Sequence, residues 1–157
     1  MIINKAQYEL VKEAREALFT FCESLSWEDY IQPVPNFGQG SIRKTQAHIA
    51  DTYIHWIGRY ALQNTTSYLD DKTINSIKEM RVEYQKINKL VAAFFEQYDC
   101  QENLVIKHLL RSHGEFISTP LTVITHVITH EFHHKGQLVS MARIMGYQPP
   151  DTDLIRL

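Results

Sequence analysis

Histidine is the residue type whose number and spacing could do chemistry in this chain. Eight histidines occur in 157 residues, and six of them fall between positions 108 and 134. In a helix, residues four apart differ by about 40° around the axis and about 6 Å along it, so His126, His130 and His134 would form a row on one face. Neighbours in this row can chelate one metal ion, whereas His126 and His134 lie about 12 Å apart. The spacing therefore predicts one metal-binding pair, completed by a ligand from another helix.

The segment from His130 to His134 also fits the pattern H-E-x-x-H, in which zinc proteases use the glutamate as a general base. Glu131 is therefore a candidate catalytic base. A protease of this kind needs a third ligand, but no His or Glu follows His134, and Gly136 falls two residues after it, where metzincins have a glycine after three. Glu131 and His133 each lie about 100° around the helix from the nearest row member. We favour a surface or structural role for Glu131, and we expect His133 to face another surface.

The other histidines are predicted to be packed or hydrogen-bonded side chains, the usual role of a single histidine on an apolar face. They are His55, His108 and His113. For His126 packing is favoured, but this residue could also line a pocket or support a metal ligand. Cys22 follows the helical spacing of apolar residues and is predicted to be a small buried hydrophobe. The two cysteines have no metal or redox spacing, so no disulfide framework is expected.

Charge and hydropathy exclude two classes of partner. The chain has 16 Lys and Arg against 18 Asp and Glu, a formal charge of −2, and its basic residues are dispersed. Nucleic-acid binding is therefore not expected. No stretch approaches the roughly 18 consecutive apolar residues of a membrane span, and the first residues lack the pattern of a secretory signal. We expect a cytoplasmic protein that binds neither nucleic acid nor membrane.

Two helices are predicted in the first half of the chain. Apolar residues recur at spacings of three and four over residues 4–25, and Asn4 with Gln7 resembles a capping box. Two prolines and two glycines make residues 31–40 a loop. A second apolar stripe runs from the cap Ser41 to about Gln63, with His48 on or beside it. His48 is thus placed to meet a histidine pair on a facing helix.

Two further helices are predicted in the second half. A connection over residues 64–71 ends in a cap at Asp71 or Thr73, and the third helix shows the cleanest helical period in the chain. Residues 103–118 are expected to be irregular or briefly extended. Thr119 and Pro120 predict the start of the last helix, and Gly146 predicts its left-handed end. Four helices without alternating strands predict a single all-α domain over residues 1–157, a four-helix bundle, and bundles build metal sites from facing helices.

The motifs around the candidate ligands resemble those of a known family. They are Ser41-Ile42-Arg43 leading into Ala47-His48-Ile49-Ala50, the segment His126 to Gln137, and Gly146-Tyr147. Together they resemble the DinB/YfiT-like family of metal-dependent enzymes. The resemblance implies an antiparallel four-helix bundle with a crossover connection, a homodimer, and a divalent metal held by His48, His130 and His134. The family name comes from damage inducibility, which implies a stress response but no DNA chemistry.

Three imidazoles leave Zn(II), Ni(II) or Fe(II) with an open position, which suits catalysis better than a closed structural site. Some relatives in the resembled family use low-molecular-weight thiols such as bacillithiol, mycothiol or glutathione. The leading hypothesis is therefore a thiol-dependent S-transferase acting on a small-molecule substrate. The alternatives are a non-catalytic metal-binding bundle dimer and a metal-dependent hydrolase that uses Glu131. Four further residues could line the pocket: Tyr53, Trp56, Asp151 and Asp153. Gly136 is interpreted as permitting close helix approach beside the site.

Overall fold

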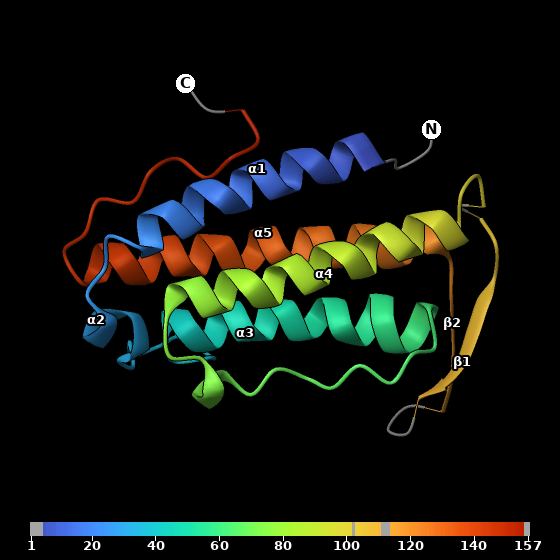
Figure 1. The fold of residues 1–157 in the computed structure, drawn as a ribbon, viewed down its shortest axis with the longest axis horizontal. Helices are drawn as coiled ribbons and strands as arrows, with labels where there is room; N and C mark the ends of the chain where they lie inside the picture. The colour runs from blue at the N-terminus through green and yellow to red at the C-terminus, as the bar shows by residue number, and fades with distance from the viewer. Residues whose placement is uncertain (1–4, 102, 111–113, 156–157) are drawn as a thin grey trace.

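Four long helices dominate the computed structural model, which describes residues 5–101, 103–110 and 114–155. They lie side by side with their long axes close to one direction (Figure 1). They are α1 (Lys5–Cys22), α3 (Ile42–Tyr53), α4 (Ile77–Gln97) and α5 (Pro120–Ile144). α3 continues directly into the π-helix η1 (Ile54–Ala61), and two short helices, α2 (Trp27–Ile31) and the 3-10 helix η2 (Asp71–Thr73), lie in the connections.

The connection from η1 to α4 runs back along the length of the helices (Figure 1). Because of this crossover connection, α3 and α4 run in the same direction, and α1 and α5 run in the opposite one. α3 packs directly against both α5 and α4, while α1 packs against α4. The pairing of α3 with α5 places the two helices that carry the candidate ligands next to each other.

Side-chain caps explain where three of the long helices begin. Ser41, Ser76 and Thr119 each accept a hydrogen bond from the backbone N–H three residues further on. The predicted starts of the second and last helices are therefore confirmed. The predicted cap of the third helix, at Asp71 or Thr73, is wrong. Asp70 caps the short η2 instead, which leaves Ser76 to start α4.

The first predicted helix is shorter than its apolar pattern indicates. α1 ends at Cys22, and the side chain of Ser26 then caps α2 by accepting from the Asp29 N–H. The apolar spacing continues to Leu25, which is buried although it lies outside the helix. The cap predicted at Asn4 lies outside the described residues. Cys22 is buried as predicted, and burial raises the pKa of its thiol to about 12.

A β-hairpin stands where the sequence predicted irregular or briefly extended chain. β1 (Ile106–Leu110) and β2 (Gly114–Ser118) pair antiparallel, with Ile106 opposite Ser118. The prediction of an all-α fold is therefore wrong in this segment, and the protein is mainly helical with one small sheet. The hairpin packs against η1, where the Tyr60 hydroxyl donates to the Ile106 carbonyl at 2.9 Å. That contact between distant segments stabilises strands too short to be recognised from their own pattern.

The core lies between the long helices and is filled by their apolar stripes. The stripe predicted for the third helix is buried in α4 from Met80 to Phe94. Gly146 follows the last helix with φ +90°, the left-handed conformation predicted for its end. Among the described residues, no helix combines the length and the apolar character that crossing a membrane requires.

Candidate metal centre

Three histidines from two helices converge in one place. His48 extends from α3, and His130 and His134, one turn apart, extend from α5. The ring centroid of His48 lies 5.0 Å from that of His130 and 4.7 Å from that of His134. The ring centroids of His130 and His134 are 4.4 Å apart. One ring nitrogen from each residue lies within 4.8 Å of the others. The group could therefore hold a metal ion.

The positions of the ring nitrogens fit this use. The Nε2 atoms of His130 and His134 are 3.2 Å apart. Two nitrogens bound to one tetrahedral zinc at 2.0–2.1 Å stand about 3.3 Å apart, which is close to that spacing. His130 Nδ1 is buried without a hydrogen-bond partner in the described part of the chain. Metal-ligating histidines usually donate this second N–H to a partner, so the support for a metal comes from the Nε2 spacing and not from Nδ1.

Gln137 orients the ring of His134. Its Oε1 lies 2.7 Å from His134 Nδ1, and an amide oxygen only accepts, so Nδ1 carries the proton. The lone pair of His134 then resides on Nε2, which faces His130. Gln137 Nε2 also lies 3.2 Å from Nε2 of His133, so Gln137 connects His133, which is outside the three-histidine group, to His134. Hydrogen bonds of this kind fix the tautomer of metal-ligating histidines.

The environment keeps the three imidazoles neutral. Burial lowers the pKa of His48 and of His134. It lowers the pKa of His130 to about 4, with a further contribution from the neighbouring imidazoles, His134 foremost. Metal ions bind neutral imidazole, so a group that is already deprotonated at neutral pH releases no proton on binding.

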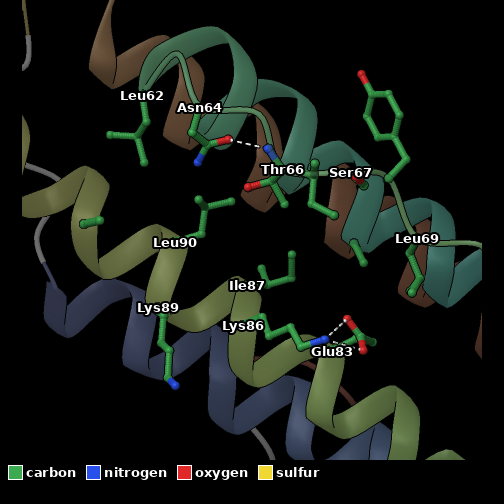
Figure 2. Close-up of a pocket in the computed structure, with 14 residues that line it drawn as sticks. Leu62, Asn64, Thr66, Ser67, Leu69, Glu83, Lys86, Ile87, Lys89 and Leu90 are labelled. Carbon is green, nitrogen blue, oxygen red and sulfur yellow. Dashed lines mark hydrogen bonds and ion pairs between the residues drawn. The ribbon is translucent and has the colours of Figure 1, made fainter.

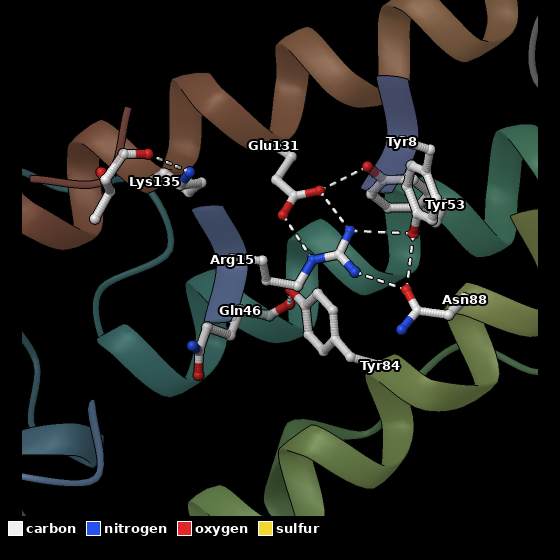
Figure 3. Close-up of polar contacts among 9 residues, drawn as sticks. Tyr8, Arg15, Gln46, Tyr53, Tyr84, Asn88, Glu131 and Lys135 are labelled. Atoms are coloured by element: carbon white, nitrogen blue, oxygen red, sulfur yellow. Dashed lines mark hydrogen bonds and ion pairs between the residues drawn. The ribbon is translucent and has the colours of Figure 1, made fainter. Parts of the chain in front are cut away.

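Glu131 follows His130 in the chain, but its side chain points toward Arg15 of α1 and not toward the other two histidines of the group. Its carboxylate accepts two hydrogen bonds from Arg15 of α1, Nε to Oε1 at 2.7 Å and Nη2 to Oε2 at 2.8 Å (Figure 3). The Tyr53 hydroxyl of α3 donates to Oε2 at 2.6 Å. Of the two roles favoured for Glu131, surface or structural, the surface role is wrong, because Glu131 is 1% exposed. Its contacts match the structural role.

This cluster links all four long helices. Arg15 Nη1 donates to Asn88 Oδ1 of α4 at 2.8 Å, and the Tyr8 hydroxyl donates to the same oxygen at 2.9 Å. The guanidinium carbon of Arg15 also lies 4.9 Å from the centre of the Tyr84 ring. Because Glu131 is part of this cluster, the interactions that fix its position also fix the turn of α5 that carries His130.

The remaining predicted residues lie outside the three-histidine group. His126 is exposed, with its ring 5.2 Å from Trp56 and 5.8 Å from His130, so it lies beside the group and packs on an aromatic ring. His133 is exposed, as predicted. Asp151 and Asp153 are exposed in the C-terminal segment, where Asp151 Oδ1 accepts from the Asp153 N–H.

Single histidines elsewhere fill the packing roles predicted for them. His55 Nδ1 lies 2.7 Å from the Tyr68 hydroxyl, and the His108 ring meets Tyr60 edge-on at 6.2 Å. His113 lies outside the described residues. Gly136 is exposed, and a Cβ at this position would meet nothing within 4 Å. The interpretation that Gly136 permits close helix approach is therefore wrong.

Sequence reasoning missed three polar residues that hold this region together. They are Arg15, Gln137 and Lys135. Lys135 is 2% exposed and donates to the Thr152 carbonyl at 2.7 Å, which ties the C-terminal segment to α5 (Figure 3). The sequence does contain features that could have identified two of them. Arg15 lies on the apolar face of α1, three residues before Leu18, which indicates burial. Gln137 is three residues from His134, a spacing that brings side chains together on a helix.

Comparisons with known proteins identify the family of the chain. A model of the DinB family matches residues 1–157. The chain is also 25% identical over 154 residues to the uncharacterized protein YizA of Bacillus subtilis (strain 168), an alignment that covers 94% of this chain and 91% of YizA. The family match spans both helices that carry the histidine group. The chain therefore belongs to the DinB family.

Proposed function

We propose that His48, His130 and His134 bind one divalent metal ion, and that the protein uses it to join a low-molecular-weight thiol, through its sulfur, to a small electrophilic substrate. The observation that carries the metal site is the convergence of three neutral imidazoles from α3 and α5, two of them with Nε2 atoms 3.2 Å apart. Zn, Ni and Fe(II) all suit three imidazole ligands.

His48, His130 and His134 would hold the ion, which would supply Lewis-acid chemistry that favours the thiolate form of a thiol near neutral pH. The contribution of the chain is to fix the three ring nitrogens. Gln137 holds the tautomer of His134, and the Arg15–Glu131 pair holds the turn of α5 behind His130. In the transfer, the thiol sulfur forms a bond to the electrophilic carbon, the thiol proton goes to solvent, and the leaving group departs with its bonding electron pair.

The thiol chemistry rests on the open position and on the relatives in the family that use such thiols. Thiol consumption should be measured with bacillithiol, mycothiol and glutathione against a panel of electrophiles that includes 1-chloro-2,4-dinitrobenzene. We expect turnover that requires metal and that falls at least about 100-fold in His48→Ala, since loss of a residue that merely supports a ligand already costs 10–100-fold. His55→Ala, outside the group, should retain turnover. Absence of metal-dependent turnover across the panel would contradict the transferase and favour a non-catalytic metal-binding protein.

A hydrolase that uses Glu131 as base has less support. Both carboxylate oxygens of Glu131 accept hydrogen bonds from Arg15, and one also accepts from Tyr53. Three of the about four acceptor sites of this carboxylate are then engaged, by Arg15 and Tyr53 rather than by a group at the three histidines. If a hydrolytic activity is found, Glu131→Gln should leave its rate unchanged, apart from any loss of folded protein.

We propose that residues 1–157 form one domain with the architecture of an antiparallel four-helix bundle with a crossover connection, and that it works as a cytoplasmic homodimer. The side-by-side packing of the four long helices supports the bundle. Sedimentation velocity tests the dimer, which predicts a species of twice the 18.3 kDa chain mass. A species of the chain mass alone at micromolar concentration would contradict it.

A further inference from the structure

A pocket lies between α4 and the crossover connection, away from the three-histidine group (Figure 2). Its volume is about 550 Å³, and its walls come from Leu62–Leu69, from Glu83–Ala93 and from α3. Ala50 lines the pocket and stands about 200° around α3 from His48. The pocket therefore opens on the opposite face of α3 from the candidate metal centre, and none of the three histidines lines it.

The base and sides of the pocket are mainly apolar. Ile87 and Leu90 of α4 extend toward the crossover connection (Figure 2). Two of the lining residues are alanines, Ala50 and Ala93, whose side chains end at Cβ and occupy little of the pocket. A volume between about 300 and 1,000 Å³ with predominantly apolar walls is typical of a small-molecule site. An entire helix or strand of a protein partner would need an open groove instead.

Uncharged amide and hydroxyl groups of the pocket lie along the crossover connection. Asn64, Thr66 and Ser67 line this side. Asn64 Oδ1 accepts from the Thr66 N–H at 3.2 Å, which fixes the amide group at the wall (Figure 2). Amide and hydroxyl groups of this kind orient a ligand through one or two hydrogen bonds while the apolar walls supply most of the contact area.

The charges near the pocket are already compensated or directed elsewhere. Lys86 Nζ is 2.7 Å from Glu83 Oε1 and 2.9 Å from Oε2, so this lysine and this glutamate neutralise each other at the rim (Figure 2). Lys89 is also among the lining residues, and the ammonium end of its side chain extends away from the other labelled lining residues (Figure 2). A ligand with a net charge would lose its hydration against the mainly apolar walls, and Lys86 and Glu83 already neutralise each other there, so that loss is unfavourable.

We propose that this pocket binds a neutral, largely apolar small molecule whose hydroxyl or carbonyl group meets the side of the pocket formed by Asn64 and Ser67. The site is separate from the candidate metal centre and does not depend on the metal. Size, apolar walls, uncharged hydrogen-bonding groups along the crossover connection and compensated charge all favour this ligand class.

The test uses the full-length protein and the neutral apolar fluorophore Nile red as the probe. Ala92 and Ala93 are adjacent exposed alanines on α4, but only Ala93 lines the pocket. We expect wild type to bind one probe per chain, Ala93→Phe to bind at least about tenfold more weakly, and Ala92→Phe to bind as wild type does. Equal binding by Ala93→Phe and wild type, or no saturable binding by wild type, would overturn the proposal.

A second pair of variants fills the pocket from the opposite wall, in case Ala93→Phe fails to fold. Ser67→Trp should weaken Nile red binding, whereas Thr65→Trp, also exposed on the crossover connection but outside the pocket, should not. Competition then defines the ligand class. The proposal predicts that 1-octanol displaces the probe at lower concentration than octanoate or octylammonium does. Displacement by either ion at the same or lower concentration would overturn the assignment of a neutral ligand.

Discussion

Two neighbouring residues, His130 and Glu131, serve different parts of the structure. His130 faces His48 and His134, whereas Glu131 faces Arg15 on the helix interface. The sequence predicts the first arrangement because a spacing of four residues places histidines on one helix face. It does not predict the second, since Arg15 is 116 residues from Glu131 and only the packing of α1 on the other helices brings them together. In this H-E-x-x-H segment the glutamate is therefore bound to Arg15, and the histidines face a different side of α5.

Replacing Arg15 with Met should destabilise the protein by about 3–5 kcal/mol, because it leaves the carboxylate of Glu131 buried without its cation. Urea unfolding monitored by circular dichroism measures this loss. The double variant Arg15→Met with Glu131→Gln should lose less than Arg15→Met alone, because the buried charge is removed. As a control, Lys86→Met breaks an exposed ion pair and should cost under about 1 kcal/mol. A loss of similar size in Arg15→Met and Lys86→Met would contradict the structural role of the buried pair.

Helix and strand boundaries could be predicted from the sequence where the interaction that sets them joins residues close together in the chain. The helix starts at Ser41 and Thr119 are set by hydrogen bonds across three residues, so a short sequence window contains the whole signal. The hairpin depends on Tyr60 and other residues of η1, far from the strands in sequence, and was therefore missed. The start of the third helix was predicted at Asp71 or Thr73 because both are good capping residues, and only the structure shows that they lie in a separate short turn capped by Asp70.

Two glycines inside helical segments should respond in opposite directions to the same substitution. A Cβ at Gly136 would meet nothing within 4 Å, so Gly136→Ala should stabilise α5 by about 0.5–1 kcal/mol. A Cβ at Gly58 in η1 would lie 3.0 Å from Asn64 Oδ1 and 3.3 Å from Leu90 Cδ2, so Gly58→Ala should destabilise the protein. Thermal unfolding of the two variants beside wild type measures both effects. A rise in the midpoint for Gly58→Ala equal to that for Gly136→Ala would contradict the packing of the crossover connection on η1.

For the whole molecule, tyrosine hydroxyls buried between the helices set the behaviour at alkaline pH. Burial raises the pKa of Tyr30, and it raises those of Tyr53 and Tyr84 well above 10. In the unfolded chain these hydroxyls titrate near pH 10, so above that pH the unfolded state has released protons that the folded state keeps. The stability associated with these groups is complete below about pH 10 and falls as the pH rises further.

A pH titration should therefore show tyrosinate absorbance near 295 nm from the buried tyrosines only as the helical circular dichroism signal is lost. Both signals are measured on the same sample between pH 8 and pH 12. Full ionisation of all eight tyrosines with the helical signal intact would contradict the burial of Tyr30, Tyr53 and Tyr84.

The central claim is that three histidines from two helices hold one divalent ion, and metal binding by untagged protein tests it most directly. Isothermal titration with Zn²⁺ and Ni²⁺ should give one ion per chain for wild type. His48→Ala and His130→Ala should each lower the affinity at least about 100-fold, whereas His55→Ala should bind as wild type does. The same stoichiometry and affinity in wild type and His48→Ala would contradict the account, because α3 would then contribute no ligand.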